Sequence, residues 1–484
     1  MPSINPLRQQ QVVKRADGGE PPNPYAKLYG LRENPFPSLA IFQTAAADPR
    51  RNGEIYDPEF RRDEEKRFFR LFVQPDTPDP LGIGFLRLDP QAGGRGNGKS
   101  IFLHRLMLRV NNQDWEDWSI NTTDPQLFGL AAHVLPEPRS IKSFAHLVQH
   151  VFKTLTIRGV LPNDKNLANK IDVDFHAAVL LSMLGDDELK ELLEMPLEEL
   201  TSSLETREGL EKLLAGRNLD WAEYEDTARK LLSSSDAPVD PEVLDALVSA
   251  KWQVTGLCKE LLARSSYRWQ QNGARWLVHG LLPLLMAAGY RRFYLFIDEF
   301  ERIYISQTSR KRDEFLDSFR HHLYEAPSAA VARKFVSTLL TIHPSIDDYL
   351  LANWARTGLE QLAPLTKPRT AMHTISLGAS TTEKLGHLLI TYMDYFRIDK
   401  ARQGTPHPFA AGAMEPAMIA ARLYPRTTLW YAYMILHQAV ASGVATPISR
   451  RFVEDFVADH PTPPEDEEDR LFAALPSSRA DLTE

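Results

Sequence analysis

Residues 93–100 read Gly-Gly-Arg-Gly-Asn-Gly-Lys-Ser, so that Gly93 and Gly98 enclose four residues and Lys99 and Ser100 follow directly. Small residues at this spacing let backbone N–H groups turn toward a bound phosphate. The tip of Lys99 can then reach the β- and γ-phosphates of a nucleotide, and the Ser100 hydroxyl can complete the ligand shell of a magnesium ion. The residues expected to contact the nucleotide are Gly93, Gly94, Arg95, Gly96, Asn97, Gly98, Lys99, Ser100 and Ile101.

The glycine segment lies between a predicted strand and a predicted helix. Residues 81–88 form an apolar run typical of a buried strand, and residues 99–110 have the spacing of an amphipathic helix. A second strand is expected at 127–134 and a second helix at 140–155. This alternation predicts an α/β fold with a parallel sheet. A glycine-rich turn without a ligand is the alternative interpretation of the segment.

A pair of acids follows a third predicted strand. Within residues 292–297, the five residues after Arg292 form a continuous apolar run, and Asp298 and Glu299 stand at its carboxyl end. Ligands of open α/β sheets bind at that edge. Asp298 is therefore expected to hold Mg²⁺, directly or through water, and Glu299 to polarise the water that attacks the γ-phosphorus. The alternative is an acidic pair that only complements the dipole of a helix N-terminus.

The next strand is expected at residues 334–343, and its polar end carries Thr341 and His343. Either side chain can sense the γ-phosphate or hold the attacking water, because neighbouring parallel strands end at the same edge. We favour His343 for this role. A structural histidine before Pro344 fits the same residues.

Three arginines are candidates for contacting the γ-phosphate. Pro425 suits the first turn of a helix, which puts Arg426 at the helix start, free to project toward an anion. Arg320 and Arg333 lie between the two last predicted strands and can instead reach the nucleotide of a neighbouring subunit as arginine fingers. An ordinary surface arginine is the alternative for Arg426.

Composition limits the class of protein. The 484 residues, 43% of them apolar, provide enough core material for two or three globular domains. We expect a cytoplasmic protein without a membrane span or secretory signal, because no apolar run approaches about eighteen residues. The single cysteine, Cys258, excludes an internal disulfide.

The net charge of −8 argues against general coating of nucleic acid and leaves only local DNA contacts. Arg310, Lys311 and Arg312 are the candidates for such contacts. A solvated charge run is the more ordinary interpretation of these three residues.

Changes in composition and Gly- or Pro-rich turns along the chain predict its division into regions. A flexible arm is expected at 1–24 and a nucleotide-binding core at 25–380. Within the core, residues 25–72 are expected to pack on the edge of the nucleotide domain, and a helical insert is expected at about 160–265. A helical lid is expected at 381–460 and an acidic, Pro-rich tail at 461–484. The apolar helix at 276–289 is expected to be interrupted at Pro283.

Four segments together resemble the motifs of the AAA+/STAND superfamily: residues 93–100, 297–299, 341–343 and 424–426. They are most similar to the origin-recognition initiator clade and its bacterial relatives in phage-defence and mobile-element systems. Residues 62–65 look like the element that packs near adenine in that clade, and residues 288–290 resemble the ATPases of BREX-type defence islands. The resemblance implies a three-layer αβα P-loop NTPase with a C-terminal helical lid, and ATP and Mg²⁺ as ligands.

The chain is expected to differ from typical members of that superfamily in two ways. About two hundred residues separate Lys99 from Asp298, more than a minimal core needs, and the acidic tail after the lid leaves no space for a winged-helix DNA-binding domain.

The sequence thus predicts a Mg²⁺-dependent ATPase whose nucleotide state controls assembly with itself or with partner proteins, in a DNA-associated or phage-defence system. An ATP-binding scaffold with little hydrolysis, and a loader or transposition regulator that encircles DNA, are the alternatives.

Overall fold

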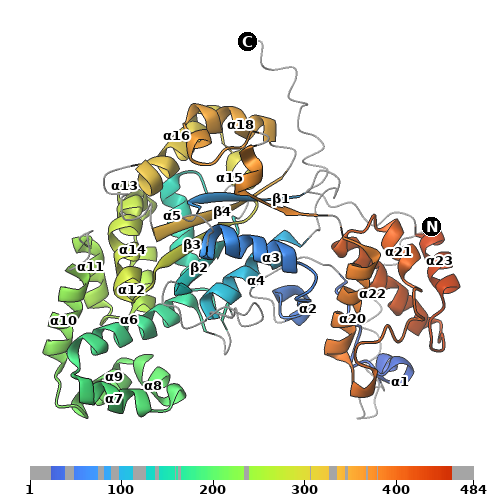
Figure 1. Ribbon diagram of the computed structural model, residues 1–484, viewed down its shortest axis with the longest axis horizontal. Helices are drawn as coiled ribbons and strands as arrows, with labels where there is room; N and C mark the ends of the chain where they lie inside the picture. The colour runs from blue at the N-terminus through green and yellow to red at the C-terminus, as the bar shows by residue number, and fades with distance from the viewer. Residues whose placement is uncertain are drawn as a thin grey trace.

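The computed structural model describes residues 23–38, 48–74, 81–88, 98–112, 127–136, 141–158, 160–161, 165–233, 239–305, 307–325, 335–343, 347–366, 369–378 and 380–460. The expected arm, up to residue 22, and the expected tail lie outside these residues. The described chain forms two units, each with its own hydrophobic core (Figure 1). The larger unit contains the sheet, and the smaller one is helical.

An all-parallel sheet of five strands confirms the predicted α/β fold. Its strand order is β2-β3-β4-β1-β5. The strands are β1 (Ile83–Leu88), β2 (Gly129–Val134), β3 (Arg292–Ile297), β4 (Val336–Ile342) and β5 (Thr374–Leu377). The four predicted strands agree with β1 to β4 within two residues at each end, whereas β5 was not predicted.

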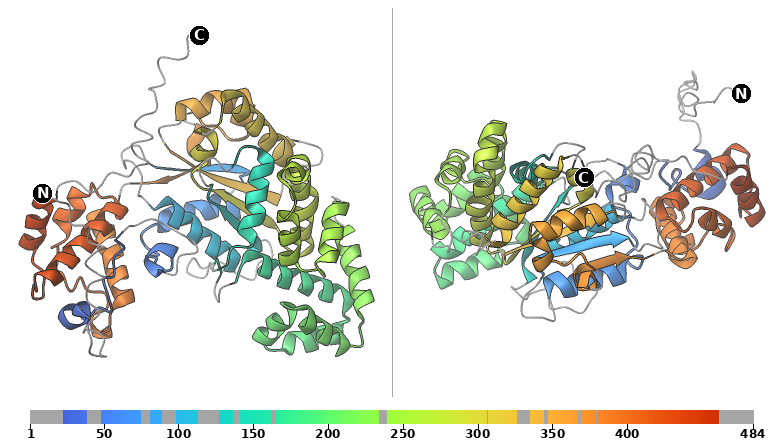
Figure 2. Two further views of the ribbon diagram at one scale, coloured as in Figure 1. Left: turned by 180° about the vertical axis from the view of Figure 1, so that it is seen from behind. Right: turned by 90° about the horizontal axis from the view of Figure 1, so that it is seen from above.

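Helices cover both faces of the sheet. The views from the front and from above place α3 and α4 on one face and α5, α16 and α18 on the other (Figures 1 and 2). The elements of these layers are α3 (Arg62–Phe68), η2 (Phe69–Val73), α4 (Lys99–Asn112), α5 (Phe144–Leu155), α15 (Phe300–Ile305), α16 (Ser309–Arg320), η7 (His321–Glu325), α18 (Asp347–Arg356), α19 (Leu359–Leu362) and η10 (Arg369–His373).

A helical region follows α5 and leads to β3. It includes the residues expected to form the helical insert, and Cys258 is buried within it. Its elements are α6 (Leu167–Met183), α7 (Asp186–Glu194), α8 (Leu197–Leu204), α9 (Arg207–Ala215), α10 (Trp221–Ser233), α11 (Pro241–Ser249), α12 (Val254–Leu262), α13 (Ser266–Trp276), η6 (Leu277–Leu281) and α14 (Leu282–Ala287).

The expected interruption at Pro283 is wrong, because the helix runs on through it from α13 to α14. Pro283 has no N–H to donate to the carbonyl of His279, four residues earlier. The π turn η6 widens the helix at this point, and the N–H of Asp240 donates to the freed His279 carbonyl at 2.5 Å. A neighbouring segment therefore supplies the hydrogen bond that proline removes.

The smaller unit is built from both ends of the described chain. Its elements are α1 (Pro24–Tyr29), α2 (Pro49–Asn52), α20 (Thr382–Phe396), η11 (Lys400–Arg402), α21 (Glu415–Ala420), α22 (Pro425–Ala441) and α23 (Arg450–Asp459). Tyr29, Leu31 and Phe36 are buried in one core with the C-terminal helices. The expectation that residues 25–72 pack on the edge of the nucleotide domain is therefore wrong for Tyr29, Leu31, Phe36, Ile55 and Phe60. The apolar residues of α3 and η2 do join the core of the sheet.

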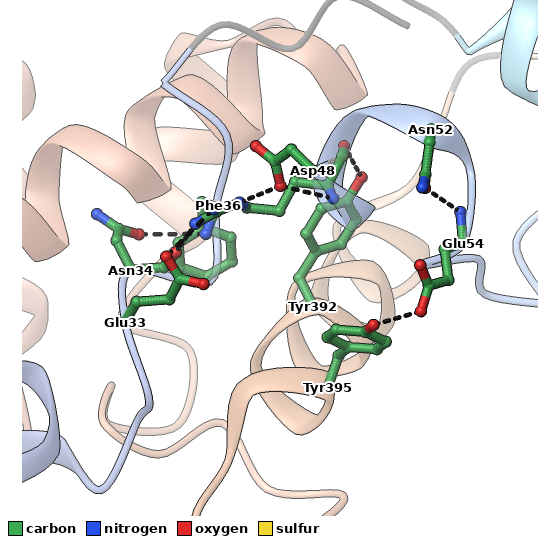
Figure 3. A network of polar contacts seen from close by, with 9 residues as sticks. Glu33, Asn34, Phe36, Asp48, Asn52, Glu54, Tyr392 and Tyr395 are labelled. Atoms are coloured by element: carbon green, nitrogen blue, oxygen red, sulfur yellow. Dashed lines mark hydrogen bonds and ion pairs between the residues drawn. The ribbon is translucent and has the colours of Figure 1, made fainter. Parts of the chain in front are cut away.

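Polar contacts hold the N-terminal segment on α20 (Figure 3). Arg50 forms ion pairs with Asp48 at 2.7 Å and Glu33 at 3.2 Å, and its guanidinium lies 5.0 Å from the ring centre of Phe396. The hydroxyl of Tyr395 donates to Glu54. These contacts, added to the shared apolar core, fix residues 33–36 and 48–54 against the C-terminal helices.

The chain joins the two units at two places, one near Arg61 and the other near Gly378. The Arg61 guanidinium donates to the Gly378 carbonyl at 3.1 Å and pairs with Glu64 at 2.9 Å. Arg61 therefore fastens the two connections to each other.

Of the helices in the described ranges, none has the length and apolar character that crossing a membrane requires.

Candidate functional site

Three candidate segments leave the sheet at the same edge. Strand β4 lies between β1 and β3, and all three are parallel. The glycine segment follows β1, the acids follow β3, and His343 follows β4. Because the carboxyl ends of parallel strands meet at one edge, the topology brings these segments together.

The glycine segment is described from Gly98 onward, and its residues Gly93, Gly94, Arg95, Gly96 and Asn97 lie outside the described part. Gly98 has φ of +79°, a left-handed conformation that side chains other than glycine adopt only with strain. Its carbonyl accepts the N–H of Phe102 at 2.9 Å and so begins α4. Lys99, Ser100 and Ile101 form the first turn, where unpaired N–H groups and the helix dipole favour an anion.

Asp298 is fully buried at the end of β3. Its Oδ1 accepts the Thr341 hydroxyl at 2.9 Å and the N–H of Glu299 at 2.9 Å, while its own N–H donates to the Val134 carbonyl at 2.9 Å. Its Oδ2 is buried without a hydrogen bond of ordinary geometry to any described residue, 3.6 Å from His133 Nε2. One carboxylate oxygen is thus held by the sheet, and the other faces His133 beyond ordinary hydrogen-bond distance.

The charge of Asp298 is stabilised from two sides. Burial alone would raise the pKa of this carboxyl, but interaction with His133 and Ser100 and the positive charge of Lys99 outweigh burial and hold the pKa at about 2. Asp298 is therefore ionised at every physiological pH. The start of α4 and the end of β3 act on each other directly through these groups.

The Ser100 hydroxyl and the Asp298 carboxylate are a suitable ligand pair for Mg²⁺. Magnesium prefers hard oxygen ligands, often one or two protein groups completed by water and phosphate oxygens. The buried Oδ2 of Asp298 supplies an oxygen that coordination of a cation would satisfy. The described residues therefore fit a magnesium ion in kind and in charge.

Glu299 has a different environment from Asp298. Its backbone has φ of +45°, which is uncommon for a residue with a side chain, and its carboxylate forms an ion pair with Arg302 on α15. Both side chains are about one-fifth exposed. To polarise a water molecule, Glu299 must release Arg302.

Thr341 and His343 are both placed at the carboxyl end of β4. Thr341 lies inside the strand, donates to Asp298, and accepts the N–H of Glu299 at 2.5 Å. His343 is the next residue after the strand and is half-buried. Thr341 is therefore the residue of this strand that orders both acids, while the role predicted for His343 remains a prediction.

Arg426 belongs to the other unit. It is the second residue of α22, which begins at Pro425 as predicted, and it is half-buried. Lys99, Ser100 and Asp298 belong to the unit with the sheet. The structure thus places the described residues of the glycine segment, both acids and His343 in one unit and Arg426 in the other.

The remaining basic candidates lie on α16 or beyond the described residues. Arg310 pairs with Glu314 at 2.8 Å and Lys311 is exposed, whereas Arg312 donates to the Tyr304 carbonyl at 2.9 Å. Arg320, the described candidate for an arginine finger, donates to the Thr357 carbonyl and pairs with Glu325 at 2.9 Å. Arg333 lies outside the described residues.

His133 is a residue of the site that the sequence reasoning missed. It is the fifth residue of β2 and reaches Asp298 from the neighbouring strand. The signal was a polar side chain near the end of an otherwise apolar strand, Gly-Leu-Ala-Ala-His-Val. An imidazole buried in such a strand needs a polar partner.

Comparison of the chain with protein-family profiles, curated protein sequences and solved structures found no match in any of the three.

Proposed function

We propose that this chain is a Mg²⁺-dependent P-loop ATPase of the AAA+/STAND type, with the α/β unit as its nucleotide-binding core and the C-terminal helices as its lid. One observation carries the proposal: Lys99 and Ser100 begin the helix that follows β1, and Asp298 ends β3 at the same edge of the parallel sheet. Groups from the start of α4 also lower the pKa of that acid. Lys and Ser after glycines are suited to a triphosphate, and an acid beside that serine is suited to its metal ion.

The roles of the residues follow from their positions. The first turn of α4 binds the phosphates through its N–H groups, and Lys99 neutralises their charge. Ser100 and Asp298 would hold Mg²⁺, which when bound would supply positive charge to the triphosphate. Thr341 fixes Asp298 and the backbone of Glu299, so that the Glu299 carboxylate is held beside the site. Once it leaves Arg302, that carboxylate can accept a proton from the attacking water.

Binding is tested with a fluorescent ATP analogue in the presence of Mg²⁺ and in excess EDTA. The parent is expected to bind more tightly with Mg²⁺, and Lys99→Ala to weaken binding roughly tenfold or more. Lys190→Ala, which removes an exposed lysine from α7, is the matched control and is expected to bind like the parent. A parent that binds no nucleotide under either condition contradicts the proposal.

Hydrolysis is tested separately by phosphate release. Glu299→Gln should reduce turnover by roughly a hundredfold while ATP still binds, since a positioned base contributes a factor of this order. Glu314→Gln on α16 changes an exposed acid in the same way and should leave turnover unchanged.

The contact between Glu299 and Arg302 favours the ATP-binding scaffold as a second candidate. A carboxylate held by an arginine does not act as a base until the pair opens. If the parent already hydrolyses ATP as slowly as Glu299→Gln and both respond to ATP in the same way, the scaffold is the correct function.

We further propose that ATP controls assembly of this chain with itself or with partner proteins, in the cytoplasm and in a DNA-associated or phage-defence setting. Sizing by light scattering with and without ATP tests self-association, and Lys99→Ala should not respond. Arg310 and Lys311, exposed at the start of α16, support the DNA-encircling alternative. That alternative requires ATP-dependent DNA binding that Arg310→Gln with Lys311→Gln weakens.

A further inference from the structure

His133 lies where the second strand of the sheet meets the strand that carries the acids. In the parallel register of β2 and β3, His133 is opposite Phe296, and Phe296 shares a face with Asp298 two residues later. The Val134 carbonyl accepts the N–H of Asp298 at 2.9 Å, so the backbone of β2 fixes the backbone of the acid. The His133 side chain is therefore held beside the Asp298 carboxylate by the sheet itself.

The side chains of His133 and Asp298 approach each other closely and are both buried. His133 Nε2 lies 3.6 Å from Asp298 Oδ2, with the side chains 4% and 0% exposed. The five other residues of β2 are apolar. An imidazole in such a strand is unfavourable unless polar groups compensate for its burial, and the Asp298 carboxylate lies within ion-pair distance of the ring.

The contacts of Asp298 divide between its two oxygens. Thr341 and the N–H of Glu299 occupy Oδ1, whereas His133 stands at Oδ2. A carboxylate held at one oxygen alone can still turn about its Cβ–Cγ bond. A second contact at Oδ2 removes that rotation and determines which lone pairs face the start of α4.

His133 also lies beside the helix that follows the glycine segment. His104 on α4 is close enough to interact electrostatically with His133, and burial together with that interaction lowers the pKa of His104 to about 3. His104 is therefore uncharged at physiological pH. His133 thus stands between a neutral imidazole on α4 and the charged acid on β3.

We propose that His133 is a positioning residue for Asp298, which orients the carboxylate for the divalent ion without touching the nucleotide. This inference rests on the proposed function, because it assumes a metal ion at Asp298. Either protonation state of the ring can carry a proton on Nε2, so the role does not depend on titration of His133. Groups that orient metal ligands commonly affect metal affinity by a factor of ten or more.

The test measures Mg²⁺ dependence and nucleotide affinity separately. Binding of a fluorescent ATP analogue is followed during a Mg²⁺ titration and, in parallel, in excess EDTA. His133→Leu should raise the Mg²⁺ concentration at half-saturation roughly tenfold and leave the affinity in EDTA unchanged. His133→Gln, whose side-chain amide can place an N–H near the position of Nε2, should recover most of the parental Mg²⁺ dependence.

His176→Leu is the matched control. His176 is likewise a buried histidine with a polar partner, the Tyr224 hydroxyl at 2.5 Å, but it lies in the helical region. The control variant should titrate with Mg²⁺ like the parent. Direct binding of Mn²⁺, followed by the loss of its free-ion electron paramagnetic resonance signal, gives a readout without hydrolysis and should show the same order of variants.

Each outcome decides a question. A His133→Leu protein with parental Mg²⁺ dependence overturns the inference, as does one that loses affinity equally in EDTA, which indicates a structural role. If Gln fails to restore what Leu removes, a positioning role for an N–H group at this place is also overturned. A parent whose nucleotide binding ignores Mg²⁺ contradicts the proposed function itself, and this result is distinguishable because it requires no variant.

Discussion

Glu65 of α3 and Arg109 of α4 form an ion pair at 2.9 Å whose side chains are 0% and 3% exposed. The pair joins the helix that follows the N-terminal segment to the helix that follows the glycine segment. The Tyr56 hydroxyl donates to the same glutamate at 2.6 Å. The structure thus places Glu65 directly against α4.

Arg109→Met should destabilise the protein by about 4 kcal/mol, because it leaves the Glu65 carboxylate buried and without its cation. Urea unfolding measures the change. Arg310→Met breaks an exposed pair with Glu314 and serves as the control, for which no measurable change is expected. Equal stabilities for the two variants would show that the buried pair is not compensating a buried charge.

Asp172 makes stability depend on pH in the direction opposite to a paired surface acid. Burial raises its pKa to about 7, against the lowering effect of hydrogen bonds from Val254 and Thr255 at the start of α12. The folded state therefore binds the proton more tightly than the unfolded state. This contribution is fully present below about pH 4, is lost as pH rises toward 7, and amounts to about 4 kcal/mol at most.

Asp172→Asn should abolish that pH dependence, since the amide does not ionise and its oxygen can still accept from α12. The difference in unfolding free energy between parent and variant, measured from pH 4.5 to 8, should move in favour of the variant as pH rises. A difference that stays constant over this range contradicts the assignment.

Glu299 should reveal its backbone conformation through a pair of substitutions. At φ of +45°, glycine is unstrained and alanine is not, so Glu299→Gly should be more stable than Glu299→Ala by about 1 kcal/mol. Thermal unfolding of both proteins checks this. Glu314, an exposed residue inside α16, provides the control pair, and there the alanine variant should be the more stable one by about 1 kcal/mol. The same order at both positions would contradict a left-handed backbone at Glu299.

Phe36 should affect the stability of the smaller unit. It is fully buried and stacks with Tyr392 at a ring separation of 6.4 Å. Phe36→Ala should destabilise this unit by about 4 kcal/mol and expose α20 to proteolysis. Phe85→Ala in β1 is the counterpart in the other core and should leave the sensitivity of α20 unchanged.

Strands β1 to β4 were predictable because each is a run of apolar residues between turn signals, and their polar ends identified Asp298 and Thr341. The strand β5 was not, because Thr374–Leu377 has four residues at the sheet edge and alternates for only two periods. The location of residues 25–60 was also beyond the sequence. Apolar spacing says that Tyr29 and Phe36 are buried, but it does not say which of two cores receives them.

The candidate site was predictable in part for a related reason. Motif spacing identifies side chains that follow one another along the chain, such as Lys99 and Ser100. His133 joins the site through strand pairing, which depends on the register of β2 against β3 and has no counterpart in local spacing. The pairing of Glu299 with Arg302 is local, yet it depends on the left-handed backbone at Glu299. The conformational preference of glutamate does not predict such a backbone.

The shared core of the smaller unit has a consequence for biosynthesis. Ribosomes deliver residues 29–36 well before the apolar partners of these residues, which extend to Phe456. These aromatic side chains therefore stay uncovered while the whole sheet is translated. Chaperone binding to residues 29–36 would protect the nascent chain until α20 to α23 have been synthesised.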